Sequence, residues 1–126
     1  MTDRVIKIES FDPAEFAEEL AAAPANHDVG TRLWFTNDRI RVWEIRLQPG
    51  ERAPFHAHTR NYFWTVVAGG TARHRTPDGS VTTSEYAVGD TKYTENSPAN
   101  PALHDLENVG DAEIRFVTVE LLDPAG

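Results

Sequence analysis

The sequence contains no cysteine, and this absence excludes several kinds of site at once. Without a thiol the chain can form no disulfide and carries no cysteine nucleophile. It also cannot bind zinc or an iron–sulfur cluster through thiolates. Stabilisation by disulfides, catalysis by a thiol and metal binding through thiolates are therefore all excluded.

Long hydrophobic runs are also absent. No segment approaches the roughly 20 apolar residues that a membrane-spanning helix needs. The first residues, MTDRVIKIES, are charged and lack the apolar stretch of a signal peptide. We therefore expect a cytoplasmic protein with no membrane partner.

Positive charge is scarce as well. The formal net charge is −8, and no long basic run occurs. Nucleic-acid binding depends largely on neutralising phosphates, so we expect no nucleic-acid partner. The apolar fraction of 40% and the charged fraction of 25% are typical of a folded globular protein. A length of 126 residues suits one domain, which we place at residues 1–126.

One helix is indicated near the start of the chain, at residues 13–22. Asp12 is a good N-cap, Pro13 suits the first helical position, and Pro24 ends the pattern. The preceding VIKI, residues 5–8, indicates a short strand. This N-terminal strand and helix occupy about residues 4–23.

From Thr31 onward the pattern changes to about eight short strands separated by turn residues. Trp43, Ile45 and Leu47 alternate with polar residues, as expected for a strand with one buried face. Pro49-Gly50 and Gly89-Asp90 are two of the turns. The class predicted is all-β, a sandwich or small barrel over about residues 31–122.

Two histidines stand one residue apart in PGERAPFHAHTRNYFWTVVAGG, residues 49–70. If His56 and His58 lie on a strand, their side chains point to the same face and can share a metal ion. Taken alone, the pair is equally compatible with a solvated loop. The surrounding spacing decides which interpretation to prefer.

That spacing resembles the first motif of the cupin superfamily. The family pattern is glycine, five residues, His-x-His, three or four residues, glutamate, six residues and glycine. Here Gly50 is followed by five residues, His56 and His58, then three residues to Tyr62 and six more to Gly69. The resemblance implies a double-stranded β-helix, a jelly-roll barrel, which agrees with the strand pattern.

A later stretch, GDTKYTENSPANPALHDLEN, is similar to the second cupin motif. Gly89 opens it, and His104 and Asn108 close it with the family's final spacing. By this resemblance His56, His58 and His104 are the metal ligands. Between Gly89 and His104 there are four residues more than the family pattern has, and its Pro-x-Gly is missing. We expect the loop over residues 95–102 to shape the mouth of the pocket.

The glutamate of the first motif has no counterpart. Tyr62 takes its place if the count runs to Gly69, and Phe63 does if the count runs to Gly70. Three neutral imidazoles leave a divalent ion with a charge of +2, which favours an anionic ligand and makes bound water more acidic. Iron, zinc, nickel, manganese and copper all suit such a site.

The sequence also resembles the small single-cupin proteins labelled as β-alanine degradation proteins, in RIRVWEIRLQPGE and in GDAEIRFVTVELL. The likeness of the three-histidine set to the metal sites of cupins implies a metalloenzyme, dioxygenase-like or isomerase-like, acting on an anionic small metabolite. The alternative is a non-catalytic cupin that binds a small molecule and has lost part of the metal site. Cupins of this kind usually pair through strands, so we expect a homodimer. A third alternative is a purely structural dimer, for which VIKI is a candidate exchanged edge strand.

Four further residues are candidates for the pocket. Tyr62 is separated from His56 and His58 by an even number of positions, so we expect it on the same face, where it lines the pocket. Trp64 shares this face and is expected to form a wall of the pocket. Trp43 is expected in the core. Arg41 shares its face and could bind a substrate carboxylate, although a surface position is expected more often. We expect His74 at the surface. No catalytic residue is assigned, and no organic cofactor is expected.

Overall fold

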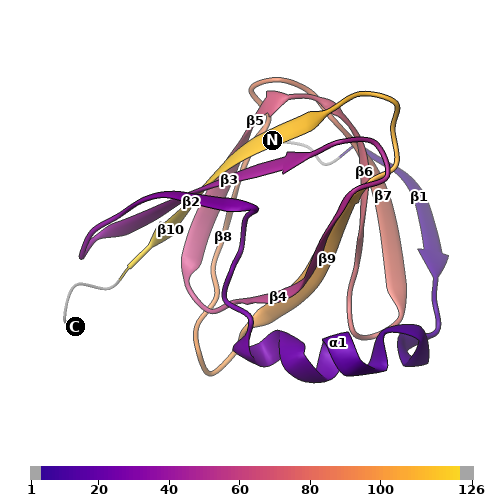
Figure 1. Ribbon diagram of the computed structural model, residues 1–126, viewed down its shortest axis with the longest axis horizontal. Coiled ribbons are helices and arrows are strands. Elements are labelled where there is room, and N and C mark those ends of the chain that lie inside the picture. Colours follow the sequence, from indigo (N-terminus) through magenta and orange to yellow (C-terminus); the bar gives the residue numbers. More distant parts are fainter. Residues whose placement is uncertain (1–3, 123–126) are drawn as a thin grey trace.

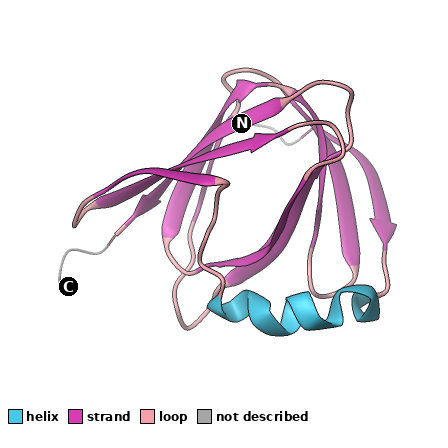
Figure 2. Cartoon of the chain, viewed as in Figure 1, coloured by secondary structure: helices cyan, strands magenta, loops and turns pink. Residues whose placement is uncertain are grey.

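The computed structural model describes residues 4–122 and consists of two facing antiparallel sheets of five strands each (Figures 1 and 2). One sheet has the order β1-β7-β6-β9-β4 and the other β2-β3-β10-β5-β8. This confirms the all-β, jelly-roll class. The strands are β1 (Arg4–Ser10), β2 (Arg32–Thr36), β3 (Ile40–Leu47), β4 (Arg52–His58), β5 (Asn61–Ala68), β6 (Gly70–Arg75), β7 (Ser80–Tyr86), β8 (Thr91–Thr94), β9 (Ala102–Asn108) and β10 (Ile114–Leu121).

The predicted helix is present as three consecutive pieces below the barrel: η1 (Pro13–Phe16), α1 (Ala17–Ala22) and η2 (Ala23–Ala25). The Asp12 carboxylate accepts a hydrogen bond from the Ala14 N–H at 3.0 Å, so the predicted cap is confirmed. The helix lies across one end of the barrel and contacts β4. None of the described helices is long and apolar enough to cross a membrane.

From Thr31 onward the described chain has nine strands rather than the eight predicted, and the additional strand is β4. Its sequence, RAPFHAH, contains Pro54 and no regular alternation of apolar and polar residues. Because β4 is the edge strand of its sheet, a proline without an N–H group breaks no ladder that the fold needs. The strand that carries the histidine pair was therefore the one hardest to predict from its pattern.

The hydrophobic core lies between the two sheets. It consists of Ile45, Leu47, Ala53, Val66, Ala72, Leu106, Ile114 and Phe116, with Trp64 and Tyr86 packed against it. These side chains come from both sheets, so the core joins them. Ile45, Trp64, Leu106 and Phe116 of this set also line the cavity that contains the histidines.

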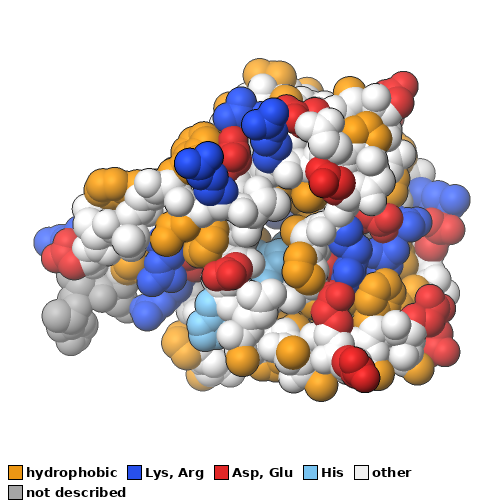
Figure 3. Space-filling model, viewed as in Figure 1, with side chains coloured by type: hydrophobic (Ala, Val, Ile, Leu, Met, Phe, Trp, Pro, Cys, Tyr) orange, Lys and Arg blue, Asp and Glu red, His pale blue; other side chains and the backbone are white. Residues whose placement is uncertain are grey.

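A hairpin of β2 and β3 projects beyond the barrel (Figure 1). Leu33, Trp34 and Phe35 of β2 are 43%, 45% and 51% exposed. Pairing with β3 skips from Leu33 to Phe35, so Trp34 is the extra residue of a β-bulge. Figure 3 shows apolar side chains over this projection, while charges of both signs are interspersed over the rest of this face.

Candidate metal centre

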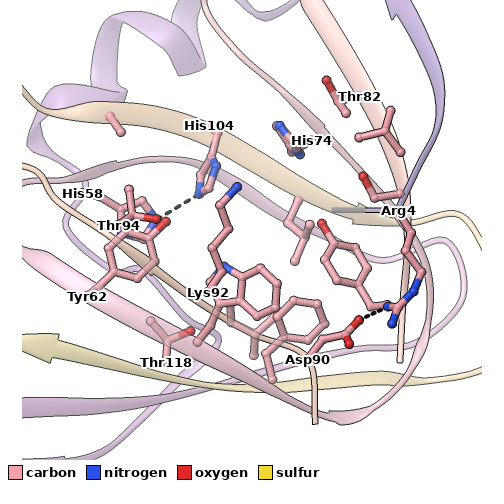
Figure 4. A pocket seen from close by; sticks show the side chains of 18 of the residues that line it. Arg4, His58, Tyr62, His74, Thr82, Asp90, Lys92, Thr94, His104 and Thr118 are labelled. Carbon is pink, nitrogen blue, oxygen red and sulfur yellow. Dashed lines mark hydrogen bonds and ion pairs between the residues drawn. The ribbon is translucent and has the colours of Figure 1, made fainter. Parts of the chain in front are cut away.

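Three histidine side chains converge inside the barrel from two neighbouring strands. His56 and His58 lie on β4, and His104 lies on β9 directly opposite His56 in the antiparallel ladder. The Nε2 atom of His58 is 3.2 Å from Nε2 of His56 and 2.9 Å from Nε2 of His104. Figure 4 shows the His58–His104 contact at one end of a pocket. The motif spacing predicted that these three histidines lie together, and the structure confirms that their side chains form a cluster.

These distances fit a shared ion. Two imidazole nitrogens that bind one ion at about 2.0–2.1 Å lie about 3.0–3.4 Å apart, depending on the angle at the ion. The donor atoms of the three residues all lie within 4.8 Å of one another. The group can therefore hold a transition metal, for which imidazole is a suitable ligand.

The tautomer of His56 is set by the backbone. Its Nδ1 lies 2.8 Å from the Pro54 carbonyl oxygen. A carbonyl only accepts hydrogen bonds, so Nδ1 carries the proton and Nε2 presents its lone pair to the cluster. Such a bond on the second nitrogen is what usually orients a metal-bound histidine. The Nδ1 atom of His58 is buried and has no partner within residues 4–122.

All three imidazoles are neutral at neutral pH. Burial lowers the pKa of His56, and burial followed by the neighbouring charge of His56 lowers the pKa of His58 to about 3. Burial is also the main cause of the lowered pKa of His104. The neutral form is the form that binds metals, so no proton has to be displaced before an ion binds.

Tyr62 lies beside the cluster, on β5. Its ring stacks on His58 with centroids 4.0 Å apart and planes 9° apart. Burial raises the pKa of Tyr62 to about 12, although a hydrogen bond with Thr94 opposes the rise. Phe63 pairs with Val119 and lies on the other face of β5. Of the two residues that the motif spacing allowed, Tyr62 is the one that lines the pocket.

The cluster opens into a cavity of about 270 Å³. Apolar side chains of Ile45, Trp64, Leu106 and Phe116 form much of its wall. The rings of Trp64 and Phe116 pack with centroids 5.2 Å apart. This volume is slightly below the range of about 300–1,000 Å³ that is usual for drug-sized ligands, so the cavity suits a small metabolite.

Sequence analysis missed three polar groups in this cavity. His74 was expected at the surface, but its ring lies 5.8 Å from that of His104, because β6 lies beside β9 in the same sheet. Lys92 of β8 also lines the cavity. At the far end Arg4 of β1 forms an ion pair with Asp90 (Figure 4). Arg4 and His74 lie outside both motifs, and the motif resemblance implied no role for Asp90 or Lys92 of the second motif; strand pairing brings these residues together.

Arg41 and Trp43 lie elsewhere. The Trp43 indole N–H donates to the buried carboxylate of Glu120 at 2.7 Å, and the Arg41 guanidinium lies 3.3 Å from the same oxygen. Trp43 is buried as expected, and Arg41 is half-buried. The anion that Arg41 binds is therefore a side chain of this protein.

Comparison with solved structures identifies the architecture. A cupin domain from Bordetella pertussis Tohama I is 28% identical, with a TM-score of 0.65 over 78% of this chain and 96% of that one. The chain has the cupin fold. A double-stranded β-helix protein from Klebsiella pneumoniae has 21% identity and a TM-score of 0.58, covering 92% of this chain and 91% of its own.

A cupin from Methanocaldococcus jannaschii, 17% identical, reaches a TM-score of 0.59 over 75% of this chain and 80% of its own. No protein-family model and no curated protein matches the chain. The cupin fold accounts for the position of the histidines: β4 and β9 pair inside the barrel, which places the two motifs side by side.

Proposed function

We propose that this protein is a small metal-binding cupin in which His56, His58 and His104 hold a divalent transition metal and an anionic metabolite binds beside it. The observation that carries the proposal is the convergence of three Nε2 atoms at 2.9 and 3.2 Å. Iron, zinc, nickel, manganese and copper are all compatible with three imidazoles. Three protein ligands leave positions for a substrate, as in catalytic metal sites.

An anionic ligand is favoured by charge. Three neutral imidazoles do not offset the two positive charges of the ion. Such an ion supplies a Lewis acid that attracts anionic oxygen atoms. The chain itself orients Nε2 of His56 through Pro54 and keeps the phenol proton on Tyr62.

The leading reaction class is dioxygenase-like or isomerase-like. The alternative is a binding cupin without catalysis, and the observation that favours it is the largely apolar wall formed by Trp64, Phe116 and Leu106. The two functions are separated by incubating the metal-loaded protein with a panel of carboxylates. Oxygen uptake or product formation supports the enzyme, whereas binding without turnover supports the alternative.

The metal site itself is tested by substitution. We expect tag-free protein to bind about one equivalent of metal, and His58→Ala and His104→Ala each to lose it, because two imidazoles hold an ion weakly against a chelator. Inductively coupled plasma mass spectrometry after dialysis measures the content. The control is His27→Ala, which changes an exposed histidine. If the variant lacking all three histidines keeps its metal, the site is elsewhere.

Two finer predictions remain proposals. The resemblance to cupins labelled as β-alanine degradation proteins fits a carboxylate ligand, and no comparison tests it. A homodimer is supported by the exposed apolar residues of β2 and by Ile6 and Ile8 of β1, which are 54% and 75% exposed. The cytoplasmic location expected from the sequence also stays a prediction.

A further inference from the structure

A row of three side chains crosses the wall of the cavity that faces the histidines. Lys92 of β8 is directly opposite Trp64 of β5, and Trp64 is directly opposite Thr118 of β10. Opposed residues of antiparallel strands project to the same face of the sheet. All three line the cavity, so the row offers a cation, an aromatic ring and a hydroxyl.

The ammonium of Lys92 lies at the histidine end of the cavity. In Figure 4 its side chain rises from β8 and points toward His104. The next row of the same sheet pairs Thr94 with Tyr62, whose ring stacks on His58. An anion beside the metal site is therefore within reach of Lys92.

Thr118 supplies an independent observation. The residue is 1% exposed, and its Oγ1 has no hydrogen-bond partner within residues 4–122. A buried hydroxyl without a hydrogen-bond partner is destabilising. A ligand that accepts a hydrogen bond from this hydroxyl removes that destabilisation.

The far end of the cavity does not compete for an anion. There the guanidinium of Arg4 is paired with Asp90, and the carboxylate of Glu85 lines the same region. One guanidinium and two carboxylates leave that end with a net negative charge, which does not attract an anion. The attraction for an anion is therefore concentrated near the histidines and Lys92.

We propose that the cavity selects a short ligand with two anionic groups. One group lies at the three-histidine site, the second binds the Lys92 ammonium, the carbon chain lies on the Trp64 ring, and Thr118 donates a hydrogen bond. Neighbouring strands are about 4.8 Å apart, so the row from Lys92 to Thr118 spans about 10 Å, and a ligand of a few carbon atoms that starts at the histidine end can contact the side chains of the row. The proposal rests on the proposed function, because the first group needs the metal.

The test compares succinate with butyrate, which have the same number of carbon atoms and differ by one carboxylate. Isothermal titration calorimetry is carried out on cobalt-loaded and on metal-free protein. We expect the parent to bind succinate at least about 10-fold more tightly than butyrate, the effect of one charge-assisted contact. Lys92→Met should abolish this preference and leave butyrate binding unchanged, and Lys92→Arg should restore it.

The matched control is Lys7→Met, which removes the same charge from an exposed lysine of β1. We expect it to keep the preference for succinate. Thr118→Val should weaken succinate binding about 3- to 10-fold without lowering the melting temperature, because the lost hydroxyl had no partner. A lower melting temperature would show that the hydroxyl is structural, and the role of Thr118 in binding would be wrong.

The proposal is overturned if the parent has no preference for succinate, or if Lys92→Met and Lys7→Met behave alike. Failure of the metal site gives a different result, since the protein would then take up no cobalt. The metal-free titrations still decide the role of Lys92 in that case, because calorimetry needs no ion. A preference for succinate that depends on Lys92 in metal-free protein would support the anion contact and overturn the metal-bound first group.

Discussion

At the scale of single residues, Tyr62 is held against His58 by ring stacking rather than by a bond through its oxygen. The planes are 9° apart and the centroids 4.0 Å apart. Its buried phenol, with a pKa of about 12, keeps its proton at neutral pH. A protonated phenol is a weak metal ligand, so Tyr62 shapes the pocket without completing the ligand set.

Substitutions at Tyr62 test this role. We expect Tyr62→Phe to leave metal content nearly unchanged and to alter binding of the anion. Tyr62→Glu should tighten metal binding, because a carboxylate adds a fourth ligand, and should weaken anion binding, because the charge of the site falls from +2 to +1. Competition with a chelator measures the first effect, and calorimetry with succinate measures the second.

Two outcomes would contradict this interpretation. If Tyr62→Phe strips the metal, the phenol oxygen is a true ligand. If Tyr62→Glu holds the metal no better than the parent, position 62 does not correspond to the glutamate of other cupins. Phe63→Glu is the matched variant, since Phe63 lies on the other face of β5 and its carboxylate should not reach the ion.

At the scale of elements, the helix and β4 are joined by Arg52. Its guanidinium donates to Glu19 of α1 and to the fully buried Asp105 of β9. It also lies 4.6 Å from the centre of the Phe16 ring. Glu19 accepts a further hydrogen bond from the Phe55 N–H, next to the histidine pair. The helix thereby fixes the strand that carries two of the three candidate ligands.

This contact predicts a pH-dependent stability. The hydrogen bonds from Arg52 lower the pKa of Glu19 more than burial raises it. A carboxylate with a lowered pKa contributes stability above its unfolded pKa of about 4.3, and that contribution is lost as the pH falls through the folded value. We expect Glu19→Gln to lower the free energy of unfolding by about 1–3 kcal/mol at pH 7.

Urea denaturation at pH 7 and at pH 3 measures the difference. The parent and Glu19→Gln should become more alike as the pH falls, because the carboxylate is protonated first in the unfolded chain and then, at a lower pH, in the folded chain. Glu18→Gln is the control, because Glu18 is an exposed carboxylate on the same helix. Equal losses in the two variants at pH 7 would refute a specific role for Glu19.

The elements also show what the sequence could predict. Turn residues and alternation predicted the all-β class, and the two motifs predicted the cluster of His56, His58 and His104. The ladder between β4 and β9 is a long-range pairing across 46 residues from His58 to His104, which periodicity alone does not reveal. The motif resemblance supplied that information.

Lys92 shows why other site residues were missed. In TKYT, alternation places Lys92 and Thr94 on one face and Thr91 and Tyr93 on the other. Hydrophobicity favours Tyr93 as the inward residue, yet Tyr93 is 50% exposed and Lys92 lines the cavity. Pairing of Lys92 with Trp64 decides the face, and that register is set by tertiary structure.

At the scale of the whole molecule, the exposed apolar hairpin predicts self-association. We expect a homodimer, with a mass about twice the chain mass of 14.1 kDa, at micromolar concentration. Phe35→Glu should shift the protein toward the monomer, because a charge buried in an apolar interface lacks a partner. Size-exclusion chromatography with light scattering measures the mass.

The control places the same charge on another exposed apolar side chain. Val88 is 72% exposed and lies in the turn before β8, so Val88→Glu should leave the mass unchanged. A monomeric parent protein would exclude the dimer. Equal dissociation by both variants would show that net charge, rather than the hairpin, controls the association.

The pairing of His56 with His104 also bears on the order of folding. His58 precedes His104 by 46 residues, so a growing chain presents an incomplete ligand pair long before the third histidine is made. Contacts between distant residues form late, because the entropy of loop closure must first be overcome. An ion that needs all three imidazoles stabilises only chains in which β4 and β9 have paired in register. An ion bound by all three histidines would therefore stabilise the chain only after the barrel has closed in the correct register.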